Sequence, residues 1–179
     1  MTVRPASPAD ATALAHLQAD AWRAGFDGLM PAAALAQLDQ LDPAPRVARW
    51  EQLLGDAETP AQVLVSEDAQ GVPSGFCVFG PTRDRDAGSD IYEIVQIGVA
   101  AQQARQGHGR ALLDAVKAKA RAAGVSELNV WVVKSNPVAN QFFAALAFKP
   151  DGTQRLDLRV TNMPLTEGRQ RCPVVEASV

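Results

Sequence analysis

The sequence predicts a single α/β (α+β) domain in which a mixed β-sheet carries helices on both faces. Its 179 residues suit one domain, because domains average about 150 residues. Residues 8–55 show helical periodicity, whereas the later part alternates strand segments with amphipathic helices. The predicted order is helices, then a hairpin, then a strand–helix–strand–helix unit. This order is typical of a mixed sheet covered by helices on both faces. No linker or repeat divides the chain, so residues 1–179 are expected to fold together.

The N-terminal part predicts a short edge strand followed by helices. Residues 3–6 form at best a short strand. Ser7 and Pro8 then indicate a helix start, with the serine as the cap and the proline in the first turn. Apolar residues at helical spacing predict three helices: residues 8–26, a stretch containing Leu35, Leu38 and Leu41, and residues 47–55.

Three strands are predicted between residues 63 and 99. Residues 63–66 and 75–79 are apolar and enclose a turn region, so they predict a hairpin. A polar loop follows at residues 82–89. Beyond it, four apolar residues and one carboxylate fall at period two, and we expect them on one strand face: Ile91, Glu93, Val95, Ile97 and Val99.

The remaining elements alternate between helix and strand. Residues 110–123 predict an amphipathic helix that ends at Gly124. Residues 128–133 predict a buried strand, and Asn136 begins a further helix. From Lys149 onward the pattern indicates weaker strand segments.

The composition argues against several classes of function. The chain has 17 Lys and Arg against 20 Asp and Glu, a net charge of −3, so no nucleic-acid partner is expected. No apolar run is long enough for a membrane span and no secretory signal is expected, which together favour a cytoplasmic location. Cys77 and Cys172 are too few for a disulfide framework and are expected as reduced, buried thiols. Abundant alanine and few lysines indicate a GC-rich bacterial genome.

Two glycines, Gly107 and Gly109, lie at the start of the amphipathic helix. The N–H groups of a helix start are unpaired and the helix dipole is positive there, so this turn can bind a phosphate group. Glycine also lets the backbone approach the anion closely. The turn is no dinucleotide fingerprint, because Leu112 stands in place of its third glycine. A glycine-rich turn that binds nothing is the alternative.

In their wider context these glycines resemble the GNAT superfamily of acyl-CoA-dependent N-acyltransferases. The family's loop motif, Arg/Gln-x-x-Gly-x-Gly/Ala, matches Gly107 and Gly109. Its later motif, Asn-x-x-Ala-x-x-Phe-Tyr-x-x-x-Gly-Phe, is similar to residues 136–148. The segment of residues 21–31, together with Trp50, resembles a common GNAT subgroup.

The resemblance implies a GNAT-like single domain with a mixed, mostly antiparallel twisted sheet. It covers residues 2–172 and has its motif core at residues 91–148. Two central strands, near residues 92–99 and 128–133, would splay to admit acetyl-CoA. The helical region of residues 8–55 would form the acceptor side.

The implied function is transfer of an acetyl group from acetyl-CoA to a primary amine by direct attack in a ternary complex. The acceptor would be a small molecule or a peptide, no metal is implied, and homodimers are frequent among relatives. A catalytically silent acyl-CoA-binding or regulatory module is the alternative. Phe143 favours it, since many members have a tyrosine there as general acid toward the coenzyme A thiolate. Two further departures are Ala104, where the loop usually has Arg or Gln, and Ala147, where the family has glycine.

The resemblance also implies which residues hold the coenzyme. The backbone of Ile97 and Val99 would align the pantetheine arm and hold the acetyl carbonyl. The amides of one continuous segment would bind the pyrophosphate: Arg105, Gln106, Gly107, His108, Gly109 and Arg110. The His108 side chain itself is expected in solvent. Asn136 would contact the pantetheine or sulfur end, cap a helix, or do both, and Phe143 would lie near the sulfur.

Glu93 is the candidate general base. A carboxylate on an apolar strand face must reach a water-filled cleft or carry a raised pKa, and either suits a base. It aligns with a strand glutamate of the family, although an edge carboxylate in solvent is the alternative. Trp22 and Phe26 are expected either to shape the acceptor site or to pack in the core. Four acidic loop residues would favour a cationic acceptor or are scattered surface charge: Asp27, Asp84, Asp86 and Asp90.

Overall fold

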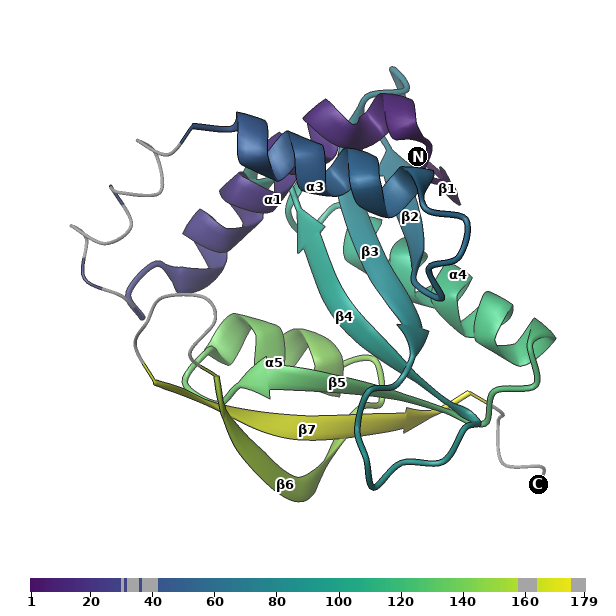
Figure 1. Ribbon diagram of the computed structural model, residues 1–179. Helices are drawn as coiled ribbons and strands as arrows, with labels where there is room; N and C mark the ends of the chain where they lie inside the picture. The colour runs from purple at the N-terminus through teal and green to yellow at the C-terminus, as the bar shows by residue number, and fades with distance from the viewer. Residues whose placement is uncertain (30, 32–35, 37–41, 158–163, 175–179) are drawn as a thin grey trace.

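In the part of the chain that the structure describes, seven strands form one sheet in the order β1-β2-β3-β4-β5-β7-β6 (Figure 1). The computed structural model describes residues 1–29, 31, 36, 42–157 and 164–174. Within these residues, every neighbouring pair of strands is antiparallel except β4 and β5, which are parallel. The prediction of a mixed, mostly antiparallel sheet is therefore confirmed.

The helices and strands follow the predicted order. The strands are β1 (Thr2–Pro5), β2 (Gln62–Glu67), β3 (Pro73–Pro81), β4 (Ile91–Val99), β5 (Glu127–Val133), β6 (Lys149–Asp157) and β7 (Leu165–Pro173). The helices are α1 (Ala11–Phe26), α3 (Ala44–Gly55), α4 (His108–Ala122) and α5 (Pro137–Ala144), with 3-10 turns η1 (Pro8–Asp10) and η2 (Ala101–Gln103). The expected helical stretch with Leu35, Leu38 and Leu41 lies outside the described residues.

Helices cover both faces of the sheet (Figure 1), as predicted. On one face, Leu14 of α1 and Trp50 of α3 pack on Val65 and Phe76 of strands β2 and β3. On the other face, helices α4 and α5 pack on alternate residues of the same strands and of β5, such as Leu64, Cys77, Phe79, Leu128 and Val130. Strands β2 and β3 are therefore buried on both faces, which explains why they read as continuous apolar runs.

The first helix begins where the capping residues predict. The backbone N–H and the hydroxyl of Ser7 both donate to Oδ2 of Asp10, at 2.7 and 3.0 Å. Arg4 of β1 donates to both oxygens of the same carboxylate, at 2.8 Å each. Its hydrogen bonds, opposed by burial, lower the pKa of Asp10 to about 2. The cluster ties the edge strand to the start of α1.

Strand β4 departs from the predicted alternation at a β-bulge. Val78 of β3 pairs with Gln96, whereas the next residue, Phe79, pairs with Ile94, so Val95 has no partner on β3. Val95 is 43% exposed. The extra residue reverses the alternation, as bulges do. Glu93 and Ile97 therefore lie on opposite faces of β4, and the expectation that both share one face is wrong.

Strands β4 and β5 separate after a short parallel seam. Their pairing runs from Ile91 with Glu127 to Ile94 with Val130. Beyond Ile94, strand β4 continues to Val99 with β3 as its described strand neighbour. The predicted splay of the two central strands is confirmed.

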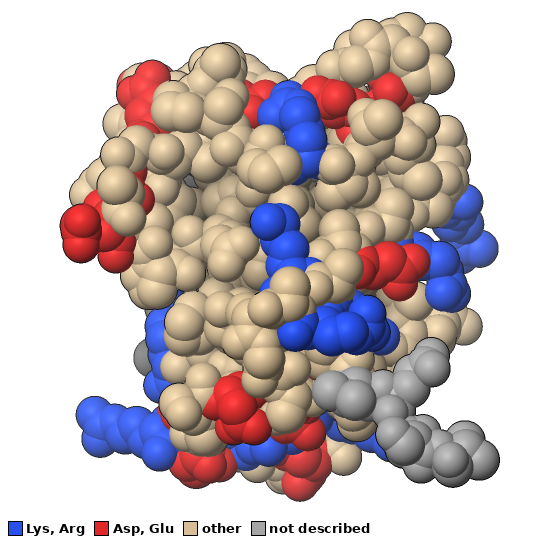
Figure 2. Space-filling view, turned by 90° about the vertical axis from the view of Figure 1, so that its right-hand side faces the viewer, with Lys and Arg blue, Asp and Glu red and all other residues tan. Residues whose placement is uncertain are grey.

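The surface carries charges of both signs. On the face shown in Figure 2, Lys and Arg side chains occur together with Asp and Glu side chains, and wide uncharged areas separate them. Among the described helices, none is both long and apolar enough to cross a membrane.

Candidate active site

The glycine turn lies directly after the splayed end of β4. Turn η2 follows β4, and the chain then enters helix α4 at His108. Two loop residues have a left-handed backbone, Arg105 with φ of 61° and Gly107 with φ of 93°. Most of the turn is exposed to solvent. The first N–H groups of a helix have no acceptor within it, so this turn presents donors to solvent beside the splay.

The two glycines serve different purposes. Gly107 caps helix α4 in the left-handed conformation that glycine tolerates best. A Cβ at Gly109 would lie 3.0 Å from two ring atoms of Phe142, so this glycine allows α5 to pack on the start of α4. The sequence-based explanation, close approach to an anion at both positions, did not anticipate this packing role.

His108 contradicts the expectation of a solvated side chain. Its ring is buried, and Nδ1 lies 3.1 Å from Oγ of Ser66 on β2. The side chain therefore fixes the start of α4 to the sheet, while its backbone remains part of the turn.

Asn136 has the capping role that was one of its two predicted roles. Its Oδ1 accepts a hydrogen bond from the N–H of Ala139 at 3.0 Å, which caps α5. Its Nδ2 donates to the carbonyl oxygen of Gly25 near the end of α1, at 3.0 Å. The side chain thus connects α5 to the N-terminal helical region.

Phe143 belongs to an aromatic cluster in the core. Its ring packs edge-on against Phe142 and Phe148, each at 5.1 Å between centroids, and the residue is buried. Nearby, Ala147 has a φ of 69°, a conformation in which glycine is favoured. Ala147, which replaces the glycine of the family motif, therefore has the left-handed backbone conformation that glycine adopts more easily.

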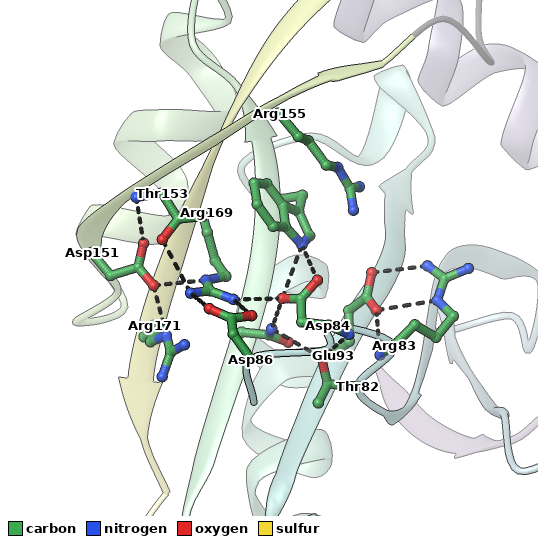
Figure 3. Close-up of polar contacts among 12 residues, drawn as sticks. Thr82, Arg83, Asp84, Asp86, Glu93, Asp151, Thr153, Arg155, Arg169 and Arg171 are labelled. Carbon is green, nitrogen blue, oxygen red and sulfur yellow. Dashed lines mark hydrogen bonds and ion pairs between the residues drawn. The ribbon is translucent and has the colours of Figure 1, made fainter. Parts of the chain in front are cut away.

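Glu93 is buried and bound by an arginine that the sequence did not single out. The residue is 2% exposed. Arg83 donates from Nη2 to Oε1 at 2.9 Å, from Nε to Oε2 at 3.2 Å and from its backbone N–H to Oε2 at 3.4 Å (Figure 3). The sequence argument considered a cleft, a raised pKa or an edge in solvent, and did not foresee this ion pair.

A cavity of about 800 Å³ lies between helices α1 and α3 and strands β3 and β4. Trp22 and Trp50 line it, whereas Phe26 is not among the lining residues. Arg83 also lines it, together with Val95 at the bulge. The cavity therefore connects the helical region with the residues that surround Glu93.

Beside Glu93, a second arginine binds three aspartates (Figure 3). Arg169 of β7 donates to Asp84 at 3.0 Å, to Asp86 at 2.8 and 2.7 Å, and to Asp151 at 2.7 Å. Its hydrogen bonds lower the pKa of Asp86 from 3.8 to about 2. Burial raises the pKa of Asp151, but hydrogen bonds from Thr153 and Arg169 outweigh it and lower that pKa.

The aspartates of this cluster are paired with Arg169 and are not scattered surface charge. Asp84 also accepts hydrogen bonds from Nδ2 of Asn129 at 2.8 Å and from the indole N–H of Trp131 at 3.1 Å. Asp90 pairs instead with the hydroxyl of Ser126. Among the residues that the structure describes, no group of three or more His, Cys, Asp or Glu is arranged to hold a metal ion.

The sequence matches a known family over most of its length. Residues 16–148 match the acetyltransferase (GNAT) family. The chain belongs to the GNAT acetyltransferase family. It is 31% identical over 137 residues to an uncharacterized N-acetyltransferase, YuaI, of Bacillus subtilis, covering 76% of this chain and 74% of the relative.

Solved structures of acetyltransferases have a similar fold. One of them is the putative acetyltransferase yncA of Salmonella typhimurium, solved with acetyl-CoA, which is 26% identical to this chain. The two structures superpose with a TM-score of 0.67, over 100% of this chain and 96% of the yncA chain. An N-acetyltransferase of Staphylococcus aureus Mu50 has the same fold at 20% identity and a TM-score of 0.69, over 97% of this chain and 98% of its own. The GNAT fold predicted from the motifs is confirmed.

Proposed function

We propose that this GNAT protein transfers an acetyl group from acetyl-CoA to a primary amine by direct attack in a ternary complex. The observation that carries the proposal is the position of Glu93, a buried carboxylate bound by Arg83, which lines a cavity that reaches β4 at its bulge. The acceptor is a small molecule or a peptide amine. Acetyl-CoA supplies the activated acetyl group as a thioester.

The donor side of the site suits a coenzyme. The exposed turn offers the backbone N–H groups from Arg105 to Arg110 to a pyrophosphate, and both of these arginine side chains are exposed. The backbone of Ile97 and Val99 lies where β4 has parted from β5, so it is free to pair with an extended pantetheine arm. Asn136 contacts the same arm, with the second hydrogen of its Nδ2, at the start of α5.

Glu93 acts as the general base through water. An amine with an ordinary pKa is protonated at neutral pH and must lose a proton before it attacks. A carboxylate can accept about four hydrogen bonds, and Arg83 supplies three, which leaves one acceptor position on Oε1. Asn129 lies opposite Glu93 in register, and its buried Oδ1 has no partner among the described residues. Two such oxygens can hold a water molecule that passes on the proton.

The leaving group needs no protein acid in this mechanism. A thiol with a pKa near 8.5 is a good leaving group as a thiolate close to neutral pH. The buried ring of Phe143 offers no proton, so the thiolate is stabilised by water and by the N-terminus of α5. The same phenylalanine favours the second candidate function, a silent acyl-CoA-binding module.

Turnover and binding, measured together, distinguish the two functions. Thiol release from acetyl-CoA is followed against a broad amine panel, with acetylated products identified by mass spectrometry, beside coenzyme A binding by calorimetry. An enzyme acetylates at least one amine, whereas a silent module binds the coenzyme and acetylates none.

The turn is tested by Gly107→Ala with Gly71→Ala as its matched control. Both glycines have positive φ, 93° and 79°, and neither has a close neighbour that a Cβ would meet, so both variants carry similar backbone strain. Only Gly107→Ala should weaken coenzyme A binding, by about tenfold or more, because only that strain alters the turn. Equal affinities of the two variants would exclude this turn as the coenzyme site.

A further inference from the structure

The cavity beside Glu93 has the size and walls of a small-molecule site. Its volume of about 800 Å³ lies within the range of ligand pockets, roughly 300–1,000 Å³. Trp22, Trp50, Val78 and Val95 give it apolar walls. Helix α1 and strand β4 meet at its floor through a hydrogen bond of 2.8 Å from Gln18 to Gln96.

The charges around this cavity are mainly positive. Its lining includes three arginines, Arg46, Arg49 and Arg83, and one carboxylate, Asp42. Asp42 is exposed and accepts a hydrogen bond from the backbone N–H of Ala44 at the start of α3. The positive charges therefore exceed the negative ones.

Two of the three arginines are available to a ligand. Arg83 is bound to Glu93, which offsets its charge. Arg46 and Arg49 line the cavity three residues apart on α3, so they lie on the same side of the helix. Neither side chain forms a hydrogen bond or an ion pair with another described residue. Arginine presents a planar fork of N–H donors that matches a carboxylate.

We propose that the acceptor is an amine that also carries a carboxylate, and that Arg46 and Arg49 bind this carboxylate. The inference rests on the proposed acetyl transfer and names its substrate class. The amine then lies at the β4 end of the cavity, near Glu93, while the tryptophans contact an apolar part of the acceptor. Asp84 and Asp86 do not oppose an anionic acceptor, because Arg169 already binds both.

Binding is measured first, since it does not depend on turnover. Coenzyme A-loaded protein is titrated by calorimetry with amino acids and their carboxamides: L-phenylalanine, L-leucine, 3-aminopropanoate and 4-aminobutanoate, each beside its amide. At least one carboxylate should bind about 10- to 100-fold more tightly than its amide, the usual effect of a hydrogen bond to a charged group. Arg46→Gln and Arg49→Gln should each remove most of this preference.

Lys119→Gln is the matched control. It removes one positive charge from the exposed surface of α4, which packs on the opposite face of the sheet. The preference for the carboxylate should be unchanged in this variant. An equal loss in all three variants would mean that overall charge, rather than the cavity, creates the preference, and would overturn the inference.

Turnover with the same panel separates this inference from the proposed function. If the protein acetylates amines but prefers no carboxylate, either in binding or in kcat/KM, the proposed acetyl transfer stands and the carboxylate site is overturned. A carboxylate preference that Arg46→Gln abolishes, without acetylation of any amine, supports the site and overturns the acetyltransferase. Equal binding of acids and amides rejects the inference whatever the turnover.

Discussion

Two arginine–carboxylate clusters lie side by side on one face of the sheet, and they differ in exposure (Figure 3). The Arg83 side chain is 58% exposed and holds one buried carboxylate, that of Glu93. The Arg169 side chain is 3% exposed and is surrounded by three aspartates. Their residue types are the same, but their surroundings are not.

The difference separates a structural cluster from the one that we propose to be reactive. All the N–H groups of Arg169 face acceptors, since the side chain donates to three carboxylates and to the hydroxyl of Thr153. With all its donors satisfied, Arg169 ties the loop between β3 and β4 to strands β6 and β7 and has no donor left for a ligand. Glu93 keeps one free acceptor position beside a cavity, which is what proton transfer requires.

The largest expected effect is the loss of activity in Glu93→Gln. Without the carboxylate, kcat/KM should fall by about 10²- to 10⁴-fold, the usual contribution of a general base. The loss should shrink as the pH rises, because the amine then deprotonates without help. The measurement is kcat/KM from pH 6 to 10 for wild type and variant.

Glu167→Gln is the control for that profile. Glu167 also pairs with an arginine, Arg155 at 2.7 Å, but it lies on β7 and does not line the cavity. The kcat/KM of Glu167→Gln should follow the wild-type pH profile. If the kcat/KM of Glu93→Gln also follows that profile, Glu93 is a structural carboxylate like those around Arg169.

The next effect is on stability. Arg169→Gln removes a buried arginine that pairs with Asp84 and Asp151, so the free energy of unfolding should fall by about 3–5 kcal/mol. Arg171→Gln removes a partly exposed arginine that shares Asp151, and should cost at most about 1 kcal/mol. Urea unfolding measures both, and similar values for the two variants would show that burial of Arg169 adds nothing.

The smallest expected effect is on acid stability. The pKa values of Asp86 and Asp151 are lowered in the folded protein, that of Asp86 to about 2. A lowered pKa stabilises the fold above the unfolded value of about 4, and this stabilisation is lost as the pH falls toward 2. Unfolding midpoints between pH 5 and 2 should therefore decline less steeply in Arg169→Gln than in wild type. Parallel slopes would mean that Arg169 does not set these pKa values.

The sequence predicted those features that short segments determine. Gly107, Asn136 and the amphipathic pattern of α4 act through neighbours a few residues away, so the turn, the helix starts and the order of elements could be predicted. Their match to GNAT motifs also predicted the splay of β4 and β5.

The features that the sequence did not predict depend on contacts between different elements of the fold. Asp84 and Arg169 are 85 residues apart, and a charged residue in a loop or a weak strand reads as solvent-exposed. Val95 bulges because of how β4 pairs with β3, and nothing within the strand itself indicates an extra residue. Arg83 determines the surroundings of Glu93 and is only 10 residues from it, but it was missed because it lies in a polar loop, where a charged side chain is expected in solvent.

The short seam between β4 and β5 makes the centre of the sheet behave like a sheet edge. Edge strands present unpaired backbone groups that another strand can join. Here two such edges face each other inside one molecule, from Val95 onward on β4 and beyond Val130 on β5. The amide hydrogens on these edges therefore exchange with solvent faster than those of the seam. An extended ligand that pairs with them slows that exchange and raises the melting temperature, which continues to rise with the logarithm of ligand concentration after the site is saturated.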